Sequence, residues 1–319
     1  MKNKAATGAK FWTTDRQKRL KVMRKGIIKH WQLYFVIALP LVHLVMFRYV
    51  PMWGSQIAFK NYSFAGGISG SPWVGFRHFQ NFFRSYQLQR LITNTIGLSL
   101  YSIFLGMWPP IILAISLNYA RMKWFKKGVQ LITYMPYFIS TVLVVGILQQ
   151  LLSLSGLVNQ VIMSMGGKAI QFLGTPSMFK SIYVFSDIWK ITGYNAVVYL
   201  AVLTSVSPEL HEAAIVDGAN IAQRIWHVDV PSIIPTMVVL LIMSCGRVMS
   251  MGAEKVLLLQ NQLNMQTSDI ISTYVYRIGL VSMQYSYSTA IGLFQSVVSL
   301  MLLVFVNWIS GKVNETSLW

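Results

Sequence analysis

The feature that most constrains this chain is a set of long stretches almost free of charged residues. A helix needs about 20 mostly apolar residues to cross the hydrocarbon core of a bilayer. The segments that meet this condition are 31–47, 91–120, 129–152, 182–206, 232–249 and 289–309. Each is apolar around most of its circumference, which is typical of helices that are buried or face lipid. The sequence therefore predicts an all-α integral membrane protein with six transmembrane helices.

Composition narrows the chemistry of the chain. Charged residues make up 11% of its 319 residues, against about 25% in an ordinary soluble domain. The one cysteine, Cys245, excludes a disulfide within the chain and a paired-thiol metal site. His43 has no other metal ligand at a suitable spacing, so no metal site is expected. The chain has no G-x-x-x-x-G-K-[ST] phosphate loop and no cluster of catalytic groups, which predicts that it neither binds ATP nor acts as an enzyme.

The distribution of the net charge of +18 predicts the orientation in the membrane. Residues 1–30 hold ten Lys or Arg and one acid, and residues 121–128 hold four basic residues. The segment 51–90 also holds four basic residues, but they are spread over forty positions. By the positive-inside rule, the N-terminus and 121–128 are cytoplasmic. The excess charge is explained by orientation and by contact with anionic membrane lipid, without a nucleic-acid partner.

Six spans give the predicted organisation of the chain. Both termini and the loops 121–128 and 207–231 are expected in the cytoplasm, with the loop 51–90 outside. The expected parts are a basic tail at 1–30, a transmembrane domain at 31–311 and a C-terminal tail at 312–319, with an extracellular loop at 51–90 and a cytoplasmic loop at 207–231. Proline is expected to end the first span at Pro51, to kink the second at Pro109-Pro110, and to precede the fifth at Pro231.

The cytoplasmic loop 207–231 is acidic, unlike the other segments on that side. It holds four of the nine acids, Glu209, Glu212, Asp217 and Asp229. Ser207-Pro208 is a helix start, and Gly218 favours a helix end. Residues 220–227 are expected to form a second short helix. The loop therefore predicts a helix, a turn and another helix on the cytoplasmic surface, with His211 and His227 as surface residues.

Several residues in this loop resemble a known family. Glu212-Ala213-Ala214, Asp217-Gly218-Ala219, Trp226 and Val230-Pro231 are similar to the EAA loop of the permease subunits of bacterial ABC importers. The resemblance implies that the loop forms coupling helices that dock into a cleft of a cytoplasmic ATPase subunit. It assigns the ATPase-coupling role to Glu212, Ala213, Ala214, Asp217 and Gly218.

Further resemblance extends over nearly the whole chain. Residues 72–76 (PWVGF) with Asn94-Thr95 resemble the sugar permeases, and the segments 268–279, 290–295 and 315–319 resemble the LplB-type oligosaccharide permeases. This similarity implies the type I importer fold, in a multi-pass protein of the bacterial cell (inner) membrane. The implied partners are a second homologous permease chain, two ATPase subunits that use ATP and Mg, a solute-binding protein and an oligosaccharide. No cofactor is expected on this chain.

Polar groups in the fourth and fifth spans are the candidates for the substrate path. Ionisable groups inside a membrane are costly and often functional, and sugar sites combine aromatic faces with amide donors. The candidates are Asp187, Trp189, Lys190, Tyr194, Asn195, Tyr199 and Arg247. Asp187 and Lys190 lie three residues apart, so they either neutralise each other, line the path, or lie at the outer headgroup level. Arg247 either lines the path or reaches the membrane interface.

The substrate is the least determined part of the sequence-based interpretation. Lys190, Arg247 and Arg277, if they face the path, suit an acidic sugar such as a uronate oligomer. A neutral oligosaccharide and a non-carbohydrate solute remain open. A secondary active transporter is a further alternative, although it usually needs intramembrane acids for ion coupling, and Asp187 is the one clear candidate.

Overall fold

The computed structural model describes residues 29–314, so nearly all of the two predicted tails lies outside the described residues. The chain divides into two compact units, 1–56 and 57–319. The described residues are helical and contain no β-strand, with one isolated antiparallel bridge between Lys60 and Trp73. The all-α prediction is confirmed for this part of the chain.

The first unit holds an apolar helical run that continues to the start of the second unit. It consists of α2 (Trp31–Leu44), a π-helical turn (Val45–Tyr49), α3 (Val50–Met52) and a 3-10 turn (Trp53–Phe59). The prediction that Pro51 ends this helix is wrong. Proline normally clashes with the carbonyl one turn earlier. The wider π turn directly before Pro51 relieves that clash, so the helix continues.

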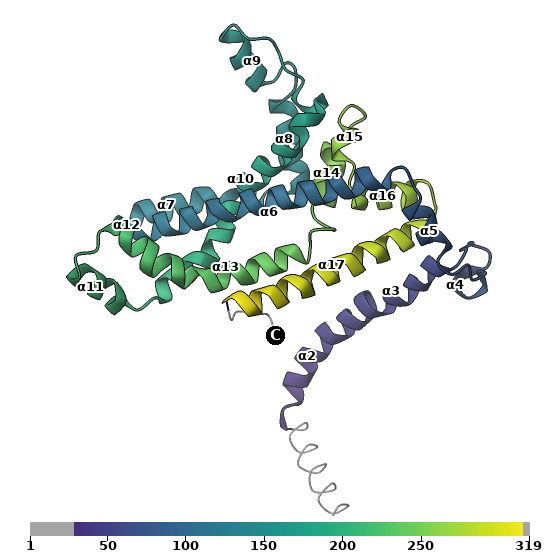
Figure 1. The fold of residues 1–319 in the computed structure, drawn as a ribbon, viewed down its shortest axis with the longest axis horizontal. Coiled ribbons are helices and arrows are strands. Elements are labelled where there is room, and N and C mark those ends of the chain that lie inside the picture. The colour runs from purple at the N-terminus through teal and green to yellow at the C-terminus, as the bar shows by residue number, and fades with distance from the viewer. Residues whose placement is uncertain (1–28, 315–319) are drawn as a thin grey trace, which may run out of the picture. The chain divides into compact units, whose positions relative to one another are not determined.

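The second unit contains the remaining helices (Figure 1). In chain order they are α4 (Gly67–Gly70), α5 (Arg77–Phe83), α6 (Leu88–Tyr119), α7 (Lys123–Tyr134), α8 (Thr141–Leu151), α9 (Leu157–Ser164), α10 (Pro176–Ser205), α11 (Pro208–Val216), α12 (Ile221–Arg224), α13 (Val230–Cys245), α14 (Ala253–Leu259), α15 (Met265–Ser268), α16 (Ile271–Tyr276) and α17 (Tyr285–Asn314).

Four helical runs among the described residues are long and apolar enough to cross a membrane. They are Trp31–Phe59, Leu88–Tyr119, Ile221–Cys245 and Tyr285–Lys312. A fifth is added if the bent pair α7 and α8 counts as one span. Helix α10 is 30 residues long but, with Asp187 and Lys190 in it, is not among the four. The count of six spans and the cytoplasmic termini remain predictions.

The third predicted span is broken rather than straight. Residues Lys123–Phe138 and Thr141–Leu151 meet at an angle of 97°. The cause is local, because Pro136 lies in a 3-10 turn and Ile139 is extended. Ser140 then starts α8, and its hydroxyl accepts a hydrogen bond from the Leu143 N–H.

Helices α12 and α13 form one continuous run from Ile221 to Cys245. The sequence predicts a separate short helix before Pro231, and this is wrong. A π-helical turn at Ile225–Asp229 precedes the Val230-Pro231 pair, just as another precedes Val50-Pro51. The same spacing has the same effect at both places, since each wide turn accommodates the proline ring.

Helices α6 and α10 pack together at the centre of the second unit. One apolar cluster joins them to α13, and it includes Ala114, Leu117, Ala196 and Ile233. Further clusters join α6 and α10 to α8 and α14, and join α5 and α6 to α16 and α17. Three of these packed helices, α6, α10 and α13, carry the polar residues described next.

Candidate functional site

The loop between α10 and α13 has the local structure that its sequence predicts at both ends of α11. The Ser207 hydroxyl accepts a hydrogen bond from the Glu209 N–H (3.3 Å), so Ser207 caps the helix. Gly218 has a φ of +82°, which a residue with a Cβ adopts only with strain. The next helix begins at a capping box formed by Asn220 and Gln223.

The five predicted coupling residues gather at one end of this loop. Glu212, Ala213, Asp217 and Gly218 are exposed, and Ala214 is half-buried. A shallow cavity of about 270 Å³ between α11 and α12 is lined in part by Ala214, Asp217 and Gly218. Most of these residues are therefore accessible to solvent, and their coupling role stays a prediction.

Buried polar contacts tie this loop to the long helices. The Asp229 side chain is fully buried and accepts a hydrogen bond from the Tyr119 hydroxyl (2.7 Å) at the end of α6. His211 Nε2 on α11 lies 3.5 Å from Asp229 Oδ1. The Arg224 guanidinium lies over the Tyr119 ring, 5.7 Å from its centroid. Asp229 thus connects α11, α6 and the start of α13.

The structure corrects one prediction for the loop and adds a residue to it. His211 is half-buried against Asp229 rather than fully on the surface, whereas His227 is exposed. Asp229, one of the four acids of the predicted surface loop, is buried rather than exposed. No local pattern distinguishes Asp229 from Asp217, since only the packing of α6 against the loop selects which acid is buried.

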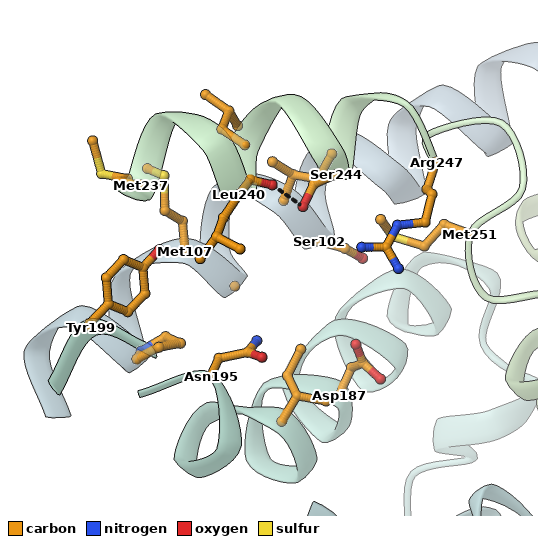
Figure 2. A pocket seen from close by; sticks show the side chains of 15 residues that line it. Ser102, Met107, Asp187, Asn195, Tyr199, Met237, Leu240, Ser244, Arg247 and Met251 are labelled. Atoms are coloured by element: carbon orange, nitrogen blue, oxygen red, sulfur yellow. Dashed lines mark hydrogen bonds between the residues drawn. The ribbon is translucent and has the colours of Figure 1, made fainter. Parts of the chain in front are cut away.

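A cavity of about 210 Å³, called the central cavity below, lies between α6, α10 and α13 (Figure 2). Most of its lining is apolar. The polar lining residues are Ser102, Asp187, Asn195, Tyr199, Ser244 and Arg247. The Ser102 Oγ is buried and has no hydrogen-bond partner in the described part of the chain. A concave, mostly apolar site with a few polar groups is typical of small-molecule binding.

This cavity brings together four of the seven predicted substrate-path residues, namely Asp187, Asn195, Tyr199 and Arg247. Figure 2 shows Arg247 and Asp187 at one end of the cavity, on opposite sides of it. Tyr199 is buried at the other end. Sequence alone offered no way to select these four, because a helix of 30 residues turns its side chains in all directions.

The other three candidates lie elsewhere. Trp189 is exposed and does not line the cavity. Tyr194 stacks on Tyr137, with ring centroids 3.8 Å apart. Lys190 donates a hydrogen bond to the Thr141 hydroxyl (3.2 Å), which joins α10 to α8.

Asp187 pairs with Lys255 and not with Lys190, which corrects one of the readings left open by the sequence. Lys255 Nζ lies 3.2 Å from Asp187 Oδ1 and also donates to the Tyr183 carbonyl (2.9 Å). Lys255 lies on α14, outside the four apolar runs, and burial lowers the pKa of its ammonium group while Asp187 opposes that shift. No sequence pattern indicates Lys255 as the partner, because it lies 68 positions from Asp187 along the chain.

Arg277, the third basic candidate for an acidic substrate, is held by another acid. It donates to the fully buried Asp269 at 2.7 Å, and Arg90 pairs with the same carboxylate at 3.3 Å. Arg277 does not line the central cavity. Of the basic residues considered for substrate binding, Arg247 is thus the one that lines it.

A helical membrane chain with a mostly apolar cavity that holds a few polar groups between its long helices, and with an exposed helical loop on one side, has the features of a transport permease. The profile of the family described as "Binding-protein-dependent transport system inner membrane component" matches residues 110–315, and the chain belongs to that family. This confirms the resemblance to the permease family.

Relatives with known names cover almost the whole chain. Protein LplB of Bacillus subtilis (strain 168) is 40% identical over 90% of this chain and 91% of its own length. The polygalacturonan/rhamnogalacturonan transport system permease protein YteP, from the same organism, is 38% identical over 98% and 97%. A chain of a bacterial ABC transporter involved in the import of the acidic polysaccharide alginate has 39% identity and a TM-score of 0.84, covering 92% of this chain and 99% of that one.

These comparisons establish the chain as a sugar ABC transporter permease with the type I fold, located in the cell membrane. A second matching structure, with the same identity and TM-score, is that of a bacterial alginate ABC transporter in complex with an alginate pentasaccharide-bound periplasmic protein.

Proposed function

We propose that this chain is one permease subunit of an ATP-driven importer for oligosaccharides that contain uronate residues. The observation that carries the acidic preference is Arg247 in the lining of the central cavity. One relative, a permease of a polygalacturonan/rhamnogalacturonan transport system, and a structural neighbour involved in alginate import support the same class of substrate.

The charge balance of the cavity favours a carboxylate. Asp187 is the only acid in its lining, and Lys255 pairs with it from outside the cavity. Arg247 has no ion pair in the described part of the chain, so its charge is available. A guanidinium binds a carboxylate through two parallel hydrogen bonds. Asn195 and Tyr199 offer amide and hydroxyl groups to the sugar.

The partners and the energy source follow from the family. Two cytoplasmic ATPases that use ATP and Mg close against the loop 207–231, where Glu212, Ala213, Ala214, Asp217 and Gly218 meet them. A second, homologous permease completes the path, and a solute-binding protein delivers the oligosaccharide outside. Buried Asp229 carries motion of α11 to α6 and α13, which line the cavity.

The test is uptake by the complete transporter in liposomes. Each assay uses trigalacturonate or maltotriose, supplied with the binding protein. We expect uptake of trigalacturonate to exceed that of maltotriose, and Arg247→Gln to lower trigalacturonate uptake about tenfold, since a charged hydrogen bond contributes about 1.5–3 kcal/mol. Arg121→Gln, an exposed arginine between α6 and α7, is the matched control. Equal uptake of both sugars by the wild type would contradict the acidic preference.

A further inference from the structure

A second cavity, of about 460 Å³, lies at the end of the second unit where α5 and the start of α17 meet. Figure 1 shows this end opposite the one that carries α11 and α12. The volume of this second cavity falls within the range of roughly 300–1,000 Å³ that is typical of small-molecule sites. It is lined by Asn61, Tyr62, His78, Asn81 and residues 283–287. Since α11 belongs to the coupling loop, this cavity lies on the opposite, outward side under the proposed function.

Contacts between two segments that are far apart in the chain hold this cavity in shape before any ligand binds. The Tyr62 N–H donates a hydrogen bond to the Ser286 hydroxyl (2.9 Å) across 224 positions of the chain. The Tyr62 and Tyr285 rings meet edge to face, with centroids 6.0 Å apart. His78 Nε2 lies 3.1 Å from the Lys60 carbonyl oxygen, which holds the start of α5 to the preceding loop. A pocket fixed by such contacts needs little reorganisation to bind a ligand.

The lining has the chemistry of a carbohydrate site. Three tyrosines, Tyr62, Tyr285 and Tyr287, provide aromatic surface for the C–H faces of a sugar ring. Three side-chain amides, those of Asn61, Asn81 and Gln284, provide donors and acceptors for hydroxyl groups. These amide groups make no hydrogen bond to another described residue, so they are available to a ligand.

Electrostatics favour a neutral or acidic sugar here over a basic ligand. No Asp or Glu lines the cavity. The segment 51–90, which supplies four of the nine lining residues, has four basic residues and no acid, and only Arg90 among the four is paired with an acid among the described residues. A carboxylate on the sugar chain is therefore attracted rather than repelled.

From these observations we infer that the cavity between the 61–81 segment and residues 283–287 binds part of the oligosaccharide chain, as an outer subsite ahead of the central cavity. This inference rests on the proposed function, since it takes the same substrate class. The outer subsite holds the incoming sugar by aromatic stacking and amide hydrogen bonds while the central cavity is still closed to it.

The test measures sugar binding to the full transporter complex in nanodiscs, without the binding protein. All proteins carry Arg247→Gln, so that the central cavity contributes little, and trigalacturonate is titrated by saturation-transfer NMR. Asn81→Asp places a carboxylate in the outer cavity and is expected to weaken trigalacturonate binding about tenfold, but maltotriose binding much less. The matched control is Gln80→Asp, which adds the same charge to the neighbouring exposed position of α5 outside the cavity.

A second pair of variants tests the aromatic surface. Tyr285→Ala should weaken both sugars about tenfold, equivalent to about 1.4 kcal/mol, whereas Tyr285→Phe keeps the ring and should bind like the parent. Equal binding by Asn81→Asp and Gln80→Asp overturns the inference. It is also overturned if Asn81→Asp weakens docking of the sugar-free binding protein and leaves sugar binding unchanged, because the cavity is then a protein interface.

Uptake by the unmodified transporter, measured in parallel, separates this inference from the proposed function. If uptake of trigalacturonate is normal and the cavity variants bind like their controls, the outer subsite is wrong and the proposed function stands. If no oligosaccharide is taken up but Asn81→Asp still weakens trigalacturonate binding about tenfold relative to Gln80→Asp, the transport assignment fails and the subsite remains.

Discussion

At the scale of single residues, the charge that faces the central cavity depends on one pairing. Lys255 is almost fully buried and reaches Asp187 from α14. A buried charge left without a partner is strongly unfavourable. Because Lys255 neutralises Asp187, Arg247 contributes the uncompensated charge of the cavity lining. An interaction between residues distant in the chain thus sets the electrostatics of the proposed path.

The backbone at Gly218 gives a prediction about coupling. Its φ of +82° is strained for alanine but is tolerated by asparagine. Gly218→Ala should therefore disturb the turn between α11 and α12, at a cost of about 1 kcal/mol, and lower sugar-stimulated ATP hydrolysis. Gly218→Asn should keep most of it. ATPase assays on the reconstituted complex check this. A similar loss of ATP hydrolysis in both variants would show that any side chain at position 218 disturbs coupling, whatever the backbone conformation.

At the scale of helices, the contact of Tyr119 with Asp229 links the loop to α6 and gives a second prediction. Tyr119→Phe removes the hydrogen bond to a buried carboxylate, which costs about 1.5–3 kcal/mol. We expect transport per ATP hydrolysed to fall, because α11 is then less firmly tied to the cavity-lining helices. Tyr276→Phe, at an exposed tyrosine on α16, is the control. An unchanged ratio of transport to hydrolysis would rule out this link.

The packing of α10 on α7 depends on a glycine. A Cβ atom at Gly193 would clash with the Thr133 carbonyl oxygen, so the two helices must separate to accommodate it. Gly193→Ala should destabilise the protein by about 3 kcal/mol, the upper end of overpacking costs, because the obstacle is backbone. Gly146→Ala on α8, where nothing lies within 4 Å, should have little effect. Thermal unfolding of the purified protein compares the two, and equal melting temperatures would contradict the close packing.

At the scale of the whole molecule, the membrane topology is the main prediction still to be measured. Six spans, with the α7 and α8 pair crossing despite its 97° bend, place Met122 inside and Leu154 outside. Both side chains are exposed. In a Cys245→Ser background, an impermeant maleimide added to intact spheroplasts should label Leu154→Cys but not Met122→Cys. Labelling of both, or of neither, would mean that the bent pair does not cross.

Much of the architecture could be read from the chain because its signals are local. Uncharged stretches located the apolar helices, and Ser207, Pro208 and Gly218 marked the limits of α11. Proline was misleading at Pro51 and Pro231, since a π-helical turn before each keeps the helix continuous. Hydropathy also missed the break before Ser140, because both arms of the bend are apolar.

The sequence by itself determined the class of protein, its helical nature and the start and end of the helix in the loop 207–231, because hydrophobic length, charge asymmetry and loop motifs are properties of neighbouring residues. The tertiary structure decided which polar residues meet. It placed Asp187, Asn195, Tyr199 and Arg247 around one cavity and gave Asp187 a partner on α14. It also buried Asp229 and brought residues 61–81 against 283–287. These contacts join residues far apart in the chain, and only the packing of the helices specifies them.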